Sequence, residues 1–391
     1  MTRVIQSQAE TAGKPPLKRI LLANPVLDDE MKQAALSALQ NERFVLGESV
    51  YKFEEEFARY CGTRFAISTS SGTAALTLSM MALGTAAGDE IITSPLSFVA
   101  SANSIIHARA TPKFADVNME TYTIDPNSVT ASLANARTKA VIPVHLYGFP
   151  AAMDELREAA DRHKFALIED AAQAHGAAYK GKIVGSIGDV GCFSFYPSKN
   201  MTVGGDGGMI VTNDDKITES VTSLRNCGRV KGSNYIHDRV GFTQRLNTVQ
   251  AAIGRVQLKR LDKWNETRRR LAAKYDALLS GLKKVTTPPR GDNDSTPVYH
   301  LYVIRCPRRD ELRSWLAERG VETGIHYPEP IHLQPIYREM FGFRGGEFPK
   351  SETVCRDVLS IPMHVNLSED DIAFVSESIH EFYEKEANSL E

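Results

Sequence analysis

Cysteine is scarce in this sequence, and it never occurs in the spacings that build a site. The five cysteines are scattered along the chain, and none belongs to a CxxC pair. An odd number without such pairs argues against a disulfide framework and against a zinc site, and it is typical of a reducing compartment. We therefore expect a cytoplasmic protein without a bound metal.

Long apolar runs and an excess of charge are also missing. The first 19 residues are polar and lack the apolar centre of a secretory signal. The most apolar stretch, Ala74 to Leu83, is too short and too rich in serine and threonine to span a bilayer. The 46 basic residues nearly balance the 48 acidic ones. Neither nucleic acid nor a membrane is therefore an expected partner.

What the sequence does have is an ordinary globular composition, with 42% hydrophobic and 24% charged residues in a chain of 391. From Phe65 onward, seven short apolar runs alternate with helical patterns. The runs are FAIST (65–69), EIITS (90–94), KFADV (113–117), AVIPV (140–144), FALIED (165–170), CFSFY (192–196) and MIVTND (209–214). This alternation predicts an α/β fold with a mostly parallel seven-stranded sheet, covered by helices on both faces.

Further helices are expected on both sides of this pattern. Asp28 can cap a helix that reaches residue 39, and a second helix is expected over 48–61 with Gly62 as its end. One long helix is expected over 247–282, where apolar residues keep helical spacing.

The last hundred residues have the pattern of a smaller αβ unit. VYHLYVIR (298–305) predicts a strand, and RDELRSWLAERG (309–320) predicts a helix that ends at a glycine. We therefore expect a tail and two domains. The predicted divisions are 1–18 for the tail, 19–260 for a large α/β domain, and 261–391 for the long helix with a small C-terminal domain.

Three segments place polar groups where a predicted strand ends. ALIEDAAQAHG ends its strand at Asp170, and Gln173 follows. GCFSFYPSKN carries Ser194 and Lys199 after its strand, and ISTSSGTAAL runs from a strand into a helix through 71–73. The carboxyl ends of parallel strands line the ligand crevice of such sheets, and the first amides of a helix bind phosphate.

A lysine, a carboxylate and a phosphate-binding turn are the set that pyridoxal 5'-phosphate (PLP) needs. The lysine forms a Schiff base with the cofactor, and the carboxylate keeps the pyridine nitrogen protonated. Each piece alone also has an ordinary explanation: a solvated surface lysine, a helix cap, or an aspartate that caps a helix. Their order and spacing together favour the cofactor.

The sequence also resembles a known family over nearly its whole length. The blocks that carry the resemblance include SSGTAAL, PLSFVASANSI, PVHLYG, IEDAAQAHGA, FSFYPSKNMTVGGDGGMIVTND, GFTQRLNTVQAAIGRVQL and GIHYPEPIHLQPIY. They are similar to the sugar aminotransferases of the DegT/StrS group, which are fold-type I PLP-dependent enzymes. The resemblance therefore implies a transferase of that fold.

The resemblance assigns a role to each cofactor residue. Lys199 would form the Schiff base and later shuttle a proton, and Asp170 would pair with the pyridine nitrogen. Gln173 would lie near the phenolic oxygen of the cofactor, and Phe98 would stack on its ring. The residues implied for the phosphate are Gly72, Thr73 and Ser194.

One position departs from the family pattern. The family has an asparagine two residues after the glycine of a GxN motif, where it reaches the phosphate in the neighbouring subunit. In GFTQRL that position is Thr243, followed by Gln244, so either side chain can replace the asparagine or the contact is lost. The family's dehydratases carry histidine at the position of Lys199, so this chain keeps the aminotransferase form.

The resemblance also implies the substrates and the assembly. It implies transfer of an amino group, with glutamate as the donor by analogy, to C3 or C4 of a nucleotide-linked keto-sugar for polysaccharide or secondary-metabolite biosynthesis. It implies ping-pong kinetics and a homodimer with shared active sites. The substrate residues considered on this basis are Gly47, His326, Tyr327 and His332.

Three alternatives belong to other classes of function. A PLP enzyme acting on another keto substrate, or a sugar dehydratase, would share the cofactor. A regulatory or binding protein would share only the fold, and it would not need the lysine, the aspartate and the phosphate turn together. A dinucleotide-binding enzyme is disfavoured, because no G-x-G-x-x-G follows the first strand and GGDGG precedes a strand.

Overall fold

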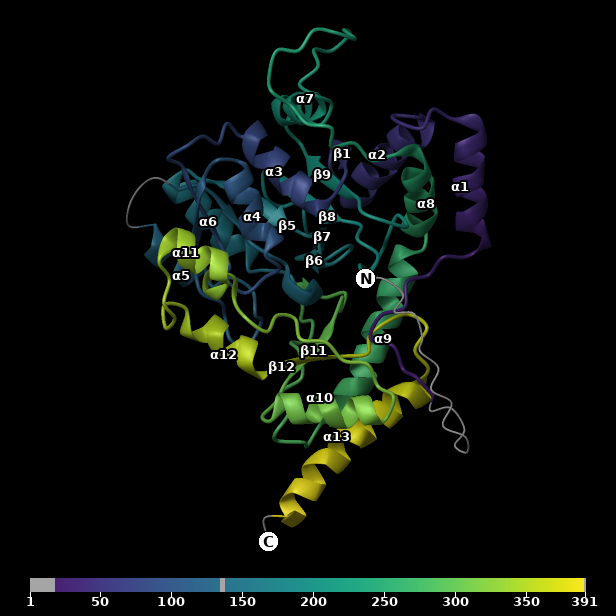
Figure 1. Ribbon diagram of the computed structural model, residues 1–391, viewed down its shortest axis with the longest axis vertical. Coiled ribbons are helices and arrows are strands. Elements are labelled where there is room, and N and C mark those ends of the chain that lie inside the picture. Colours follow the sequence, from purple (N-terminus) through teal and green to yellow (C-terminus); the bar gives the residue numbers. More distant parts are fainter. Residues whose placement is uncertain (1–17, 134–137, 390–391) are drawn as a thin grey trace.

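The computed structural model describes residues 18–133 and 138–389. Its centre is a seven-stranded sheet with the spatial order β1-β9-β8-β5-β4-β2-β3 (Figure 1). The strands are β1 (Phe65–Thr69), β2 (Glu90–Thr93), β3 (Thr111–Phe114), β4 (Thr138–Ile142), β5 (Ala166–Asp170), β8 (Val190–Ser194) and β9 (Gly208–Thr212). β9 is antiparallel to both of its neighbours, and all other pairs are parallel. The seven predicted strands and the mostly parallel sheet are confirmed.

The helices around the sheet come largely from the segments between the strands. They are α1 (Asp29–Asn41), α2 (Glu48–Cys61), α3 (Gly72–Ala82), α4 (Ala100–His107), α5 (Pro126–Ser132), α6 (Met153–His163), α7 (Asp215–Leu224) and the short turn η1 (Leu146–Gly148). Asp28 caps α1 by accepting a hydrogen bond from the backbone N of Met31, and Gly62 ends α2 in the left-handed conformation. Both helix signals in the sequence are thus confirmed.

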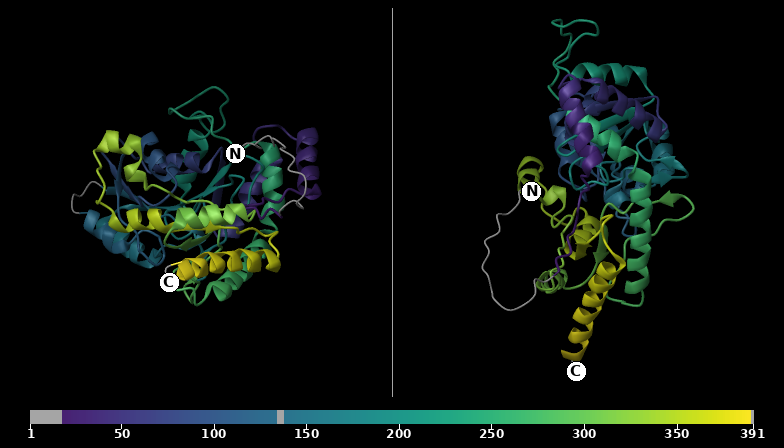
Figure 2. Two further views of the ribbon diagram at one scale, coloured as in Figure 1. Left: turned by 60° about the horizontal axis from the view of Figure 1, so that its bottom comes forward. Right: turned by 90° about the vertical axis from the view of Figure 1, so that its right-hand side faces the viewer.

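A separate apolar core covers each face of the sheet, because successive side chains of a strand point to opposite faces. On one face, Leu167 and Phe193 pack with α2 and α6. On the other, Ile168 and Cys192 pack with α3, α4 and α7. We call these the α2/α6 face and the α3/α4 face, and Figure 2 shows the layers from two further sides.

The single long helix expected over 247–282 is wrong, because the structure has two helices there. α8 (Thr248–Leu258) packs along α1, and α9 (Leu261–Leu279) packs against the last helix of the chain. Lys259 and Arg260 separate the two helices, and the Arg260 guanidinium pairs with Asp28 and Glu30 at the start of α1. No proline or glycine marks this break, so the local signals for a helix end are missing.

The C-terminal part builds its own core around two antiparallel strands. Its elements are β11 (Tyr302–Arg305), α10 (Arg309–Glu318), η2 (Ile331–Leu333), α11 (Pro335–Phe341), α12 (Pro349–Asp357), β12 (Val358–Ile361) and α13 (Glu369–Ser389). The strand and the helix expected at 298–305 and 309–320 are confirmed. A small sheet of β6 (Ala178–Tyr179), β7 (Lys182–Ile183) and β10 (Ser295–Thr296) lies in the connections.

The N-terminal end of the described chain belongs to this second core. Ile20 forms an isolated parallel bridge with Val321 and packs in the C-terminal cluster with Leu271 and Tyr275 of α9. Of the predicted tail only Lys18 lies within the described residues. The division of the chain at residue 260 stays a prediction.

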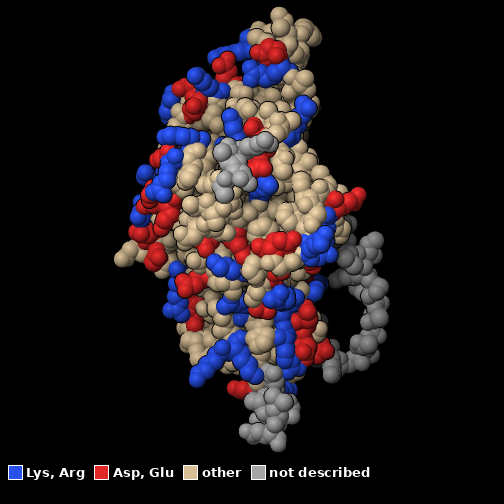
Figure 3. All heavy atoms as spheres, turned by 90° about the vertical axis from the view of Figure 1, so that its left-hand side faces the viewer, with Lys and Arg blue, Asp and Glu red and all other residues tan. Residues whose placement is uncertain are grey.

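The described residues contain no helix long and apolar enough to cross a membrane. On the face shown in Figure 3, basic and acidic side chains are interspersed rather than gathered by sign. The cytoplasmic location stays a prediction.

Candidate active site

Asp170 is the last residue of β5, and its side chain lies on the α3/α4 face with only 4% of the residue exposed. The Ser101 hydroxyl of α4 donates a hydrogen bond to Oδ2 at 2.7 Å, and the backbone N of Ala172 donates to Oδ1 at 3.2 Å. Burial raises the pKa of the Asp170 carboxyl, and these two hydrogen bonds oppose the rise. The acid is therefore fixed in position and partly stabilised in its charged form.

Lys199 follows β8, the strand next to β5, in a turn where its backbone N donates to the Tyr196 carbonyl at 2.9 Å. Burial lowers the pKa of its amino group to about 8, and the charge of Asp170 opposes this effect. The charges of the two groups thus influence each other's pKa, and we call the region at the carboxyl ends of β5 and β8 the crevice. An amine with a lowered pKa is unprotonated more often near neutral pH, and only that form attacks a carbonyl.

The start of α3 faces the end of β8 at very short range. Ser71 caps α3 by accepting a hydrogen bond from the backbone N of Ala74 at 3.1 Å. A Cβ at Gly72 would lie 2.7 Å from the Cβ of Ser194, so only glycine allows this approach. Thr73 and Ser194 are half-buried beside it. The start of this eleven-residue helix, with two hydroxyl-bearing residues beside it, is therefore suited to bind a phosphate.

Gln173 links the crevice to two tyrosines. Its Oε1 accepts a hydrogen bond from the backbone N of Tyr147 at 2.9 Å, and its Nε2 donates to the Tyr327 hydroxyl at 3.0 Å. The Phe98 ring lies beside Tyr327, with centroids 6.1 Å apart, and 56% of Phe98 is exposed. An exposed aromatic ring next to a buried polar network is suited to cover a flat ligand.

His326 lies at the same crevice. Its Nδ1 is 2.9 Å from the Ser360 hydroxyl, and its carbonyl accepts a hydrogen bond from the Tyr147 hydroxyl. Burial lowers the pKa of His326 to about 4, and the charge of Lys199 adds to this. The structure thus brings His326 and Tyr327 together with the predicted cofactor residues.

His332 lies elsewhere. Its side chain is fully buried among the rings of Phe114, Phe343 and Phe348, and its Nε2 is 3.1 Å from Glu352 Oε1. A fully buried ring has no surface with which to contact a substrate. Its role as a substrate residue stays a prediction, and the packing accounts for it without a ligand.

Gly47 also has a packing role. Its backbone N donates to the Thr248 hydroxyl at 3.2 Å, and a Cβ there would lie 2.6 Å from the Arg43 carbonyl oxygen. The glycine is needed where α2 begins against the start of α8. Substrate contact by Gly47 stays a prediction.

Thr243 is exposed in the loop between α7 and α8. Its hydroxyl is 3.4 Å from the Cys227 sulfur, and the next residue, Gln244, accepts a hydrogen bond through its carbonyl from the backbone N of Ser70 at 3.2 Å. The base of this loop therefore lies against the turn that precedes α3. A phosphate contact by Thr243 stays a prediction.

Three residues at the crevice were not among the sequence candidates. Ser101 contacts Asp170, and Tyr147 contacts Gln173. The third residue, His300, is a buried histidine whose pKa is held well below its usual range by burial and by the charge of Lys199. They come from α4, η1 and the segment before β11. Serine, tyrosine and histidine at such places carry no local signal, so only the fold reveals them.

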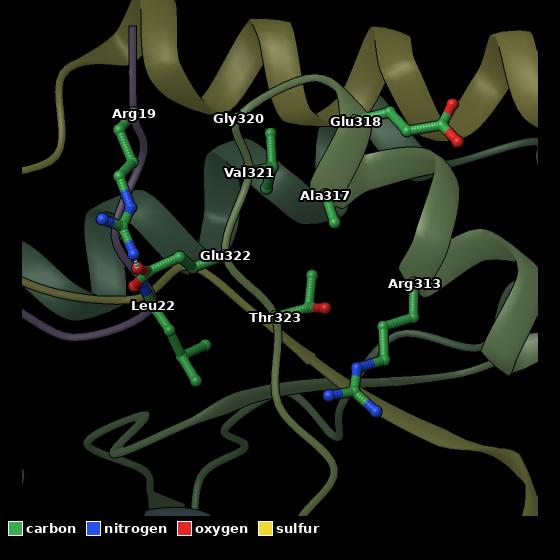
Figure 4. Close-up of a pocket in the computed structure, with 9 residues that line it drawn as sticks. All are labelled: Arg19, Leu22, Arg313, Ala317, Glu318, Gly320, Val321, Glu322 and Thr323. Carbon is green, nitrogen blue, oxygen red and sulfur yellow. Dashed lines mark hydrogen bonds and ion pairs between the residues drawn. The ribbon is translucent and has the colours of Figure 1, made fainter. Parts of the chain in front are cut away.

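A separate hollow of about 560 Å³ lies on the C-terminal part (Figure 4). It is lined by residues such as Leu22, Arg313 and Thr323, and at its side Arg19 pairs with Glu322. None of the predicted site residues lines it. The chemistry suggested by the sequence therefore belongs to the crevice at the ends of β5 and β8.

The residues of this crevice fit PLP. A buried acid ends β5, a lysine of lowered pKa follows β8, a helix start that a Cβ would obstruct follows β1, and an exposed aromatic ring follows β2, all strands of one sheet. These groups match a cofactor with a basic ring nitrogen, a carbonyl, a phosphate and a flat face.

Comparisons with known proteins agree with this geometry. Residues 25–380 match the model of the DegT/DnrJ/EryC1/StrS aminotransferase family. The chain is 41% identical to dTDP-3-amino-3,4,6-trideoxy-alpha-D-glucose transaminase of Streptomyces venezuelae, over 97% of this chain and 99% of that protein. It is also 41% identical to a pleiotropic regulatory protein of Geobacillus stearothermophilus, over 91% and 95% of the two chains.

The chain also shares its fold with a solved crystal structure. The crystal structure of S. venezuelae DesV in complex with a ketimine intermediate superposes with a TM-score of 0.87 at 42% identity, covering 90% of this chain and 94% of that one. The α/β architecture is therefore that of the fold-type I PLP-dependent transferases, as the sequence implied.

Replacing Ser101 with alanine tests the support of Asp170. The variant loses a hydrogen bond to a buried carboxylate, a contact worth about 1.5–3 kcal/mol. We expect the PLP affinity of the apoprotein, measured by titration of the visible band, to fall about tenfold or more. Ser104→Ala, on the same helix but bonded only to the Ser101 carbonyl, should leave that affinity unchanged. Equal affinities in both variants would contradict the role of Ser101.

The lowered pKa of Lys199 can be measured directly in the apoprotein. An amine reagent acts on the unprotonated form, so labelling of Lys199 should be half-maximal near pH 8. Lys180 serves as the internal control, because its hydrogen bond to Asp154 raises its pKa and shifts its labelling to higher pH. Peptide mass mapping follows both lysines in one sample. Identical pH profiles for the two would show that the crevice does not perturb Lys199.

Proposed function

The chain belongs to the DegT/DnrJ/EryC1/StrS aminotransferase family, and from that membership we propose that it aminates a nucleotide-linked keto-sugar with PLP as its cofactor. The observation that carries the proposal is the electrostatic coupling of Lys199 and Asp170, together with a helix start at Gly72 that is suited to bind a phosphate. The name of the S. venezuelae relative, a transaminase of a dTDP-linked amino sugar, supports the substrate class.

Besides Lys199, five residues of the crevice would hold the cofactor. Gly72, Thr73 and Ser194 would bind its phosphate, Phe98 would cover its ring, and Asp170 would bond its ring nitrogen. When bound, PLP supplies a carbonyl that takes up amines and a ring that accepts the electron pair released at the neighbouring carbon. An ionised Asp170 makes the ring a better acceptor because it keeps a proton on that nitrogen.

The protein's own groups then handle the proton and the orientation. Lys199 would hold the cofactor and, once released, its Nζ would carry the proton at the substrate carbon, for which a pKa near 8 is well suited. The bond from Gln173 to the Tyr327 hydroxyl fixes that tyrosine beside the Phe98 ring. Tyr327 and His326 would thus meet the sugar at the open side of the crevice.

The amino donor and the acceptor would use this crevice in turn. A donor amino acid, glutamate in the proposal, leaves as its keto acid before the keto-sugar enters, so one lysine serves both halves of the exchange. The carbon of the sugar that receives the amine is C3 or C4. A regulatory protein on the same fold would not require a lysine of lowered pKa opposite a buried acid.

The test is amination of nucleotide-linked 3-keto and 4-keto sugars in the presence of PLP and glutamate, followed by mass spectrometry. The wild-type protein should form an amino sugar from at least one of them. Lys199→Ala should lower turnover by about 10²-fold to 10⁴-fold, because it removes the group that moves the proton. Lys180→Ala, which changes an exposed lysine, should keep full turnover.

Two results would count against the proposal. Full turnover by Lys199→Ala would remove the central role of that lysine. PLP binding without turnover of any keto-sugar, but with turnover of simple keto acids, would move the enzyme to another substrate class.

The active unit in this proposal is a homodimer. The loop after α7 projects beyond the body (Figure 1) and carries three strongly exposed large apolar side chains, Tyr235, Ile236 and Val240. A further apolar set is exposed around α1 and the start of α2, at Leu36, Leu39, Phe44, Val45 and Tyr51. Because the base of the projecting loop contacts the phosphate-binding turn, a second copy that covers these side chains would lie at the active site.

Light scattering tests the assembly. The wild-type protein should have the mass of a dimer, and Val240→Asp should shift it toward the monomer because a charge replaces an apolar contact. Ile336→Asp changes an exposed apolar residue on α11 and should leave the dimer intact. A wild-type monomer with full activity would contradict the shared active site.

A further inference from the structure

Glu169 precedes Asp170 on β5 and is fully buried on the opposite, α2/α6 face of the sheet. Its Oε1 accepts hydrogen bonds from the backbone N of Ile187 at 2.7 Å and of Gly188 at 2.5 Å. Its Oε2 accepts one from the backbone N of Gly185 at 2.7 Å. Three amides of one turn thus converge on a single buried carboxylate.

The fourth partner of this carboxylate is His145, whose Nε2 is 3.0 Å from Glu169 Oε2. The backbone N of Ala151 donates to the other ring nitrogen, Nδ1, at 3.0 Å. Since Nδ1 accepts, the ring proton is on Nε2, and His145 donates it to Glu169. Every partner of Glu169 is therefore a donor, so the ionised carboxylate satisfies the whole network, whereas a protonated acid would turn a donor toward another donor.

This network joins three segments that each continue into the candidate active site. β5 continues from Glu169 into Asp170, whose carbonyl accepts a hydrogen bond from the backbone N of His145 at 3.1 Å. The segment of His145 continues to Tyr147, whose backbone N donates to Gln173. The turn 185–188 leads directly into β8, which ends at Ser194 and is followed by Lys199.

We propose that Glu169 and His145 are positioning residues that hold the cofactor-binding groups of the opposite face in register. The inference rests on the proposed function. Neither side chain contacts the crevice, because alternation along β5 points Glu169 to the far face of the sheet. Their effect is transmitted through backbone: one buried charge fixes the ends of β4 and β5 and the entry of β8. The network thus fixes, from the opposite face of the sheet, the backbone segments that carry Asp170 and Lys199.

Glu169→Gln tests the charge and the hydrogen bonds at nearly constant volume. The new amide group must turn its N–H atoms toward Ile187 and Gly188 or toward Gly185 and His145, all of which are donors. If His145 changes its tautomer to accept, its Nδ1 proton meets the amide of Ala151. The conflict therefore cannot be resolved within the network, and at least one of the three segments must shift.

The readouts are the PLP dissociation constant of the apoprotein and the pH titration of the bound cofactor's visible band. Glu169→Gln should weaken PLP binding about tenfold or more, and it should displace the titration because Asp170 and Lys199 lose their register. Asp276→Asn is the matched control. Asp276 is also a buried carboxylate, accepting from Tyr302 at 2.5 Å and pairing with Arg290 at 2.8 Å, but it lies in the C-terminal core. The Asp276→Asn substitution should lower thermal stability but leave the PLP dissociation constant and the pH titration of the visible band unchanged.

A second pair of variants tests His145 independently of Glu169. His145→Gln keeps an N–H that can reach Glu169, whereas His145→Leu removes it. PLP affinity should therefore decrease in the order wild type, His145→Gln, His145→Leu. If Glu169→Gln does not yield folded protein, this series alone tests whether the network controls PLP affinity.

The outcomes separate the inference from the proposed function. If Glu169→Gln and His145→Leu bind PLP with wild-type affinity and an unchanged titration, losing only thermal stability as Asp276→Asn does, the pair is merely structural and the inference is overturned. If the wild-type protein itself binds no PLP, the proposed function fails instead.

Discussion

The electrostatic coupling of the half-buried Lys199 with the buried Asp170 carboxylate is the constraint on which the rest of the site depends. Burial lowers the pKa of the amine and raises that of the acid, while the opposite charge and the bonds from Ser101 and Ala172 limit these shifts. Such a pair is costly to bury and is stable only where its surroundings hold it precisely in place. The sheet, the serine of α4 and the turn after β8 supply those surroundings.

The architecture explains why the chemistry gathers on one side. β5 and β8 are parallel neighbours, so their last residues, Asp170 and Ser194, lie at the same edge of the sheet. Lys199 lies in the turn that follows β8, where its charge influences Asp170. Because side chains alternate along β5, two consecutive acids point to opposite faces of the sheet. Asp170 faces the crevice, while Glu169 faces the buried side, where backbone amides and His145 satisfy it. One strand thus carries both the proposed partner of the cofactor, Asp170, and its proposed support, Glu169.

The extent to which the sequence predicts this arrangement follows from the range of the interactions. Strands such as FALIED and the helix starting at Glu48 are set by local pattern and by Gly62, so they can be read from the chain. The break between α8 and α9 has no local proline or glycine, and it coincides with a contact between Arg260 and Asp28, more than two hundred residues away. Ser101 is recognised as a partner of Asp170 only when α4 is packed beside β5, and the burial of His332 against Phe114 and Phe348 likewise depends on long-range packing. The substrate role of His332 stays a prediction. Asp170, Lys199 and the phosphate turn were predicted from the strand ends and their roles from the resemblance, whereas the contact of Ser101 with Asp170 was not predicted.

The most direct test of the central claim is to bind PLP to the wild-type protein, reduce the complex with borohydride and map the labelled peptide by mass spectrometry. The account predicts that the cofactor is attached at Lys199, within the segment FSFYPSKNM, because this amine combines a pKa near 8 with electrostatic coupling to Asp170. Attachment spread over exposed lysines, or no attachment at Lys199 under conditions that preserve the fold, would contradict it.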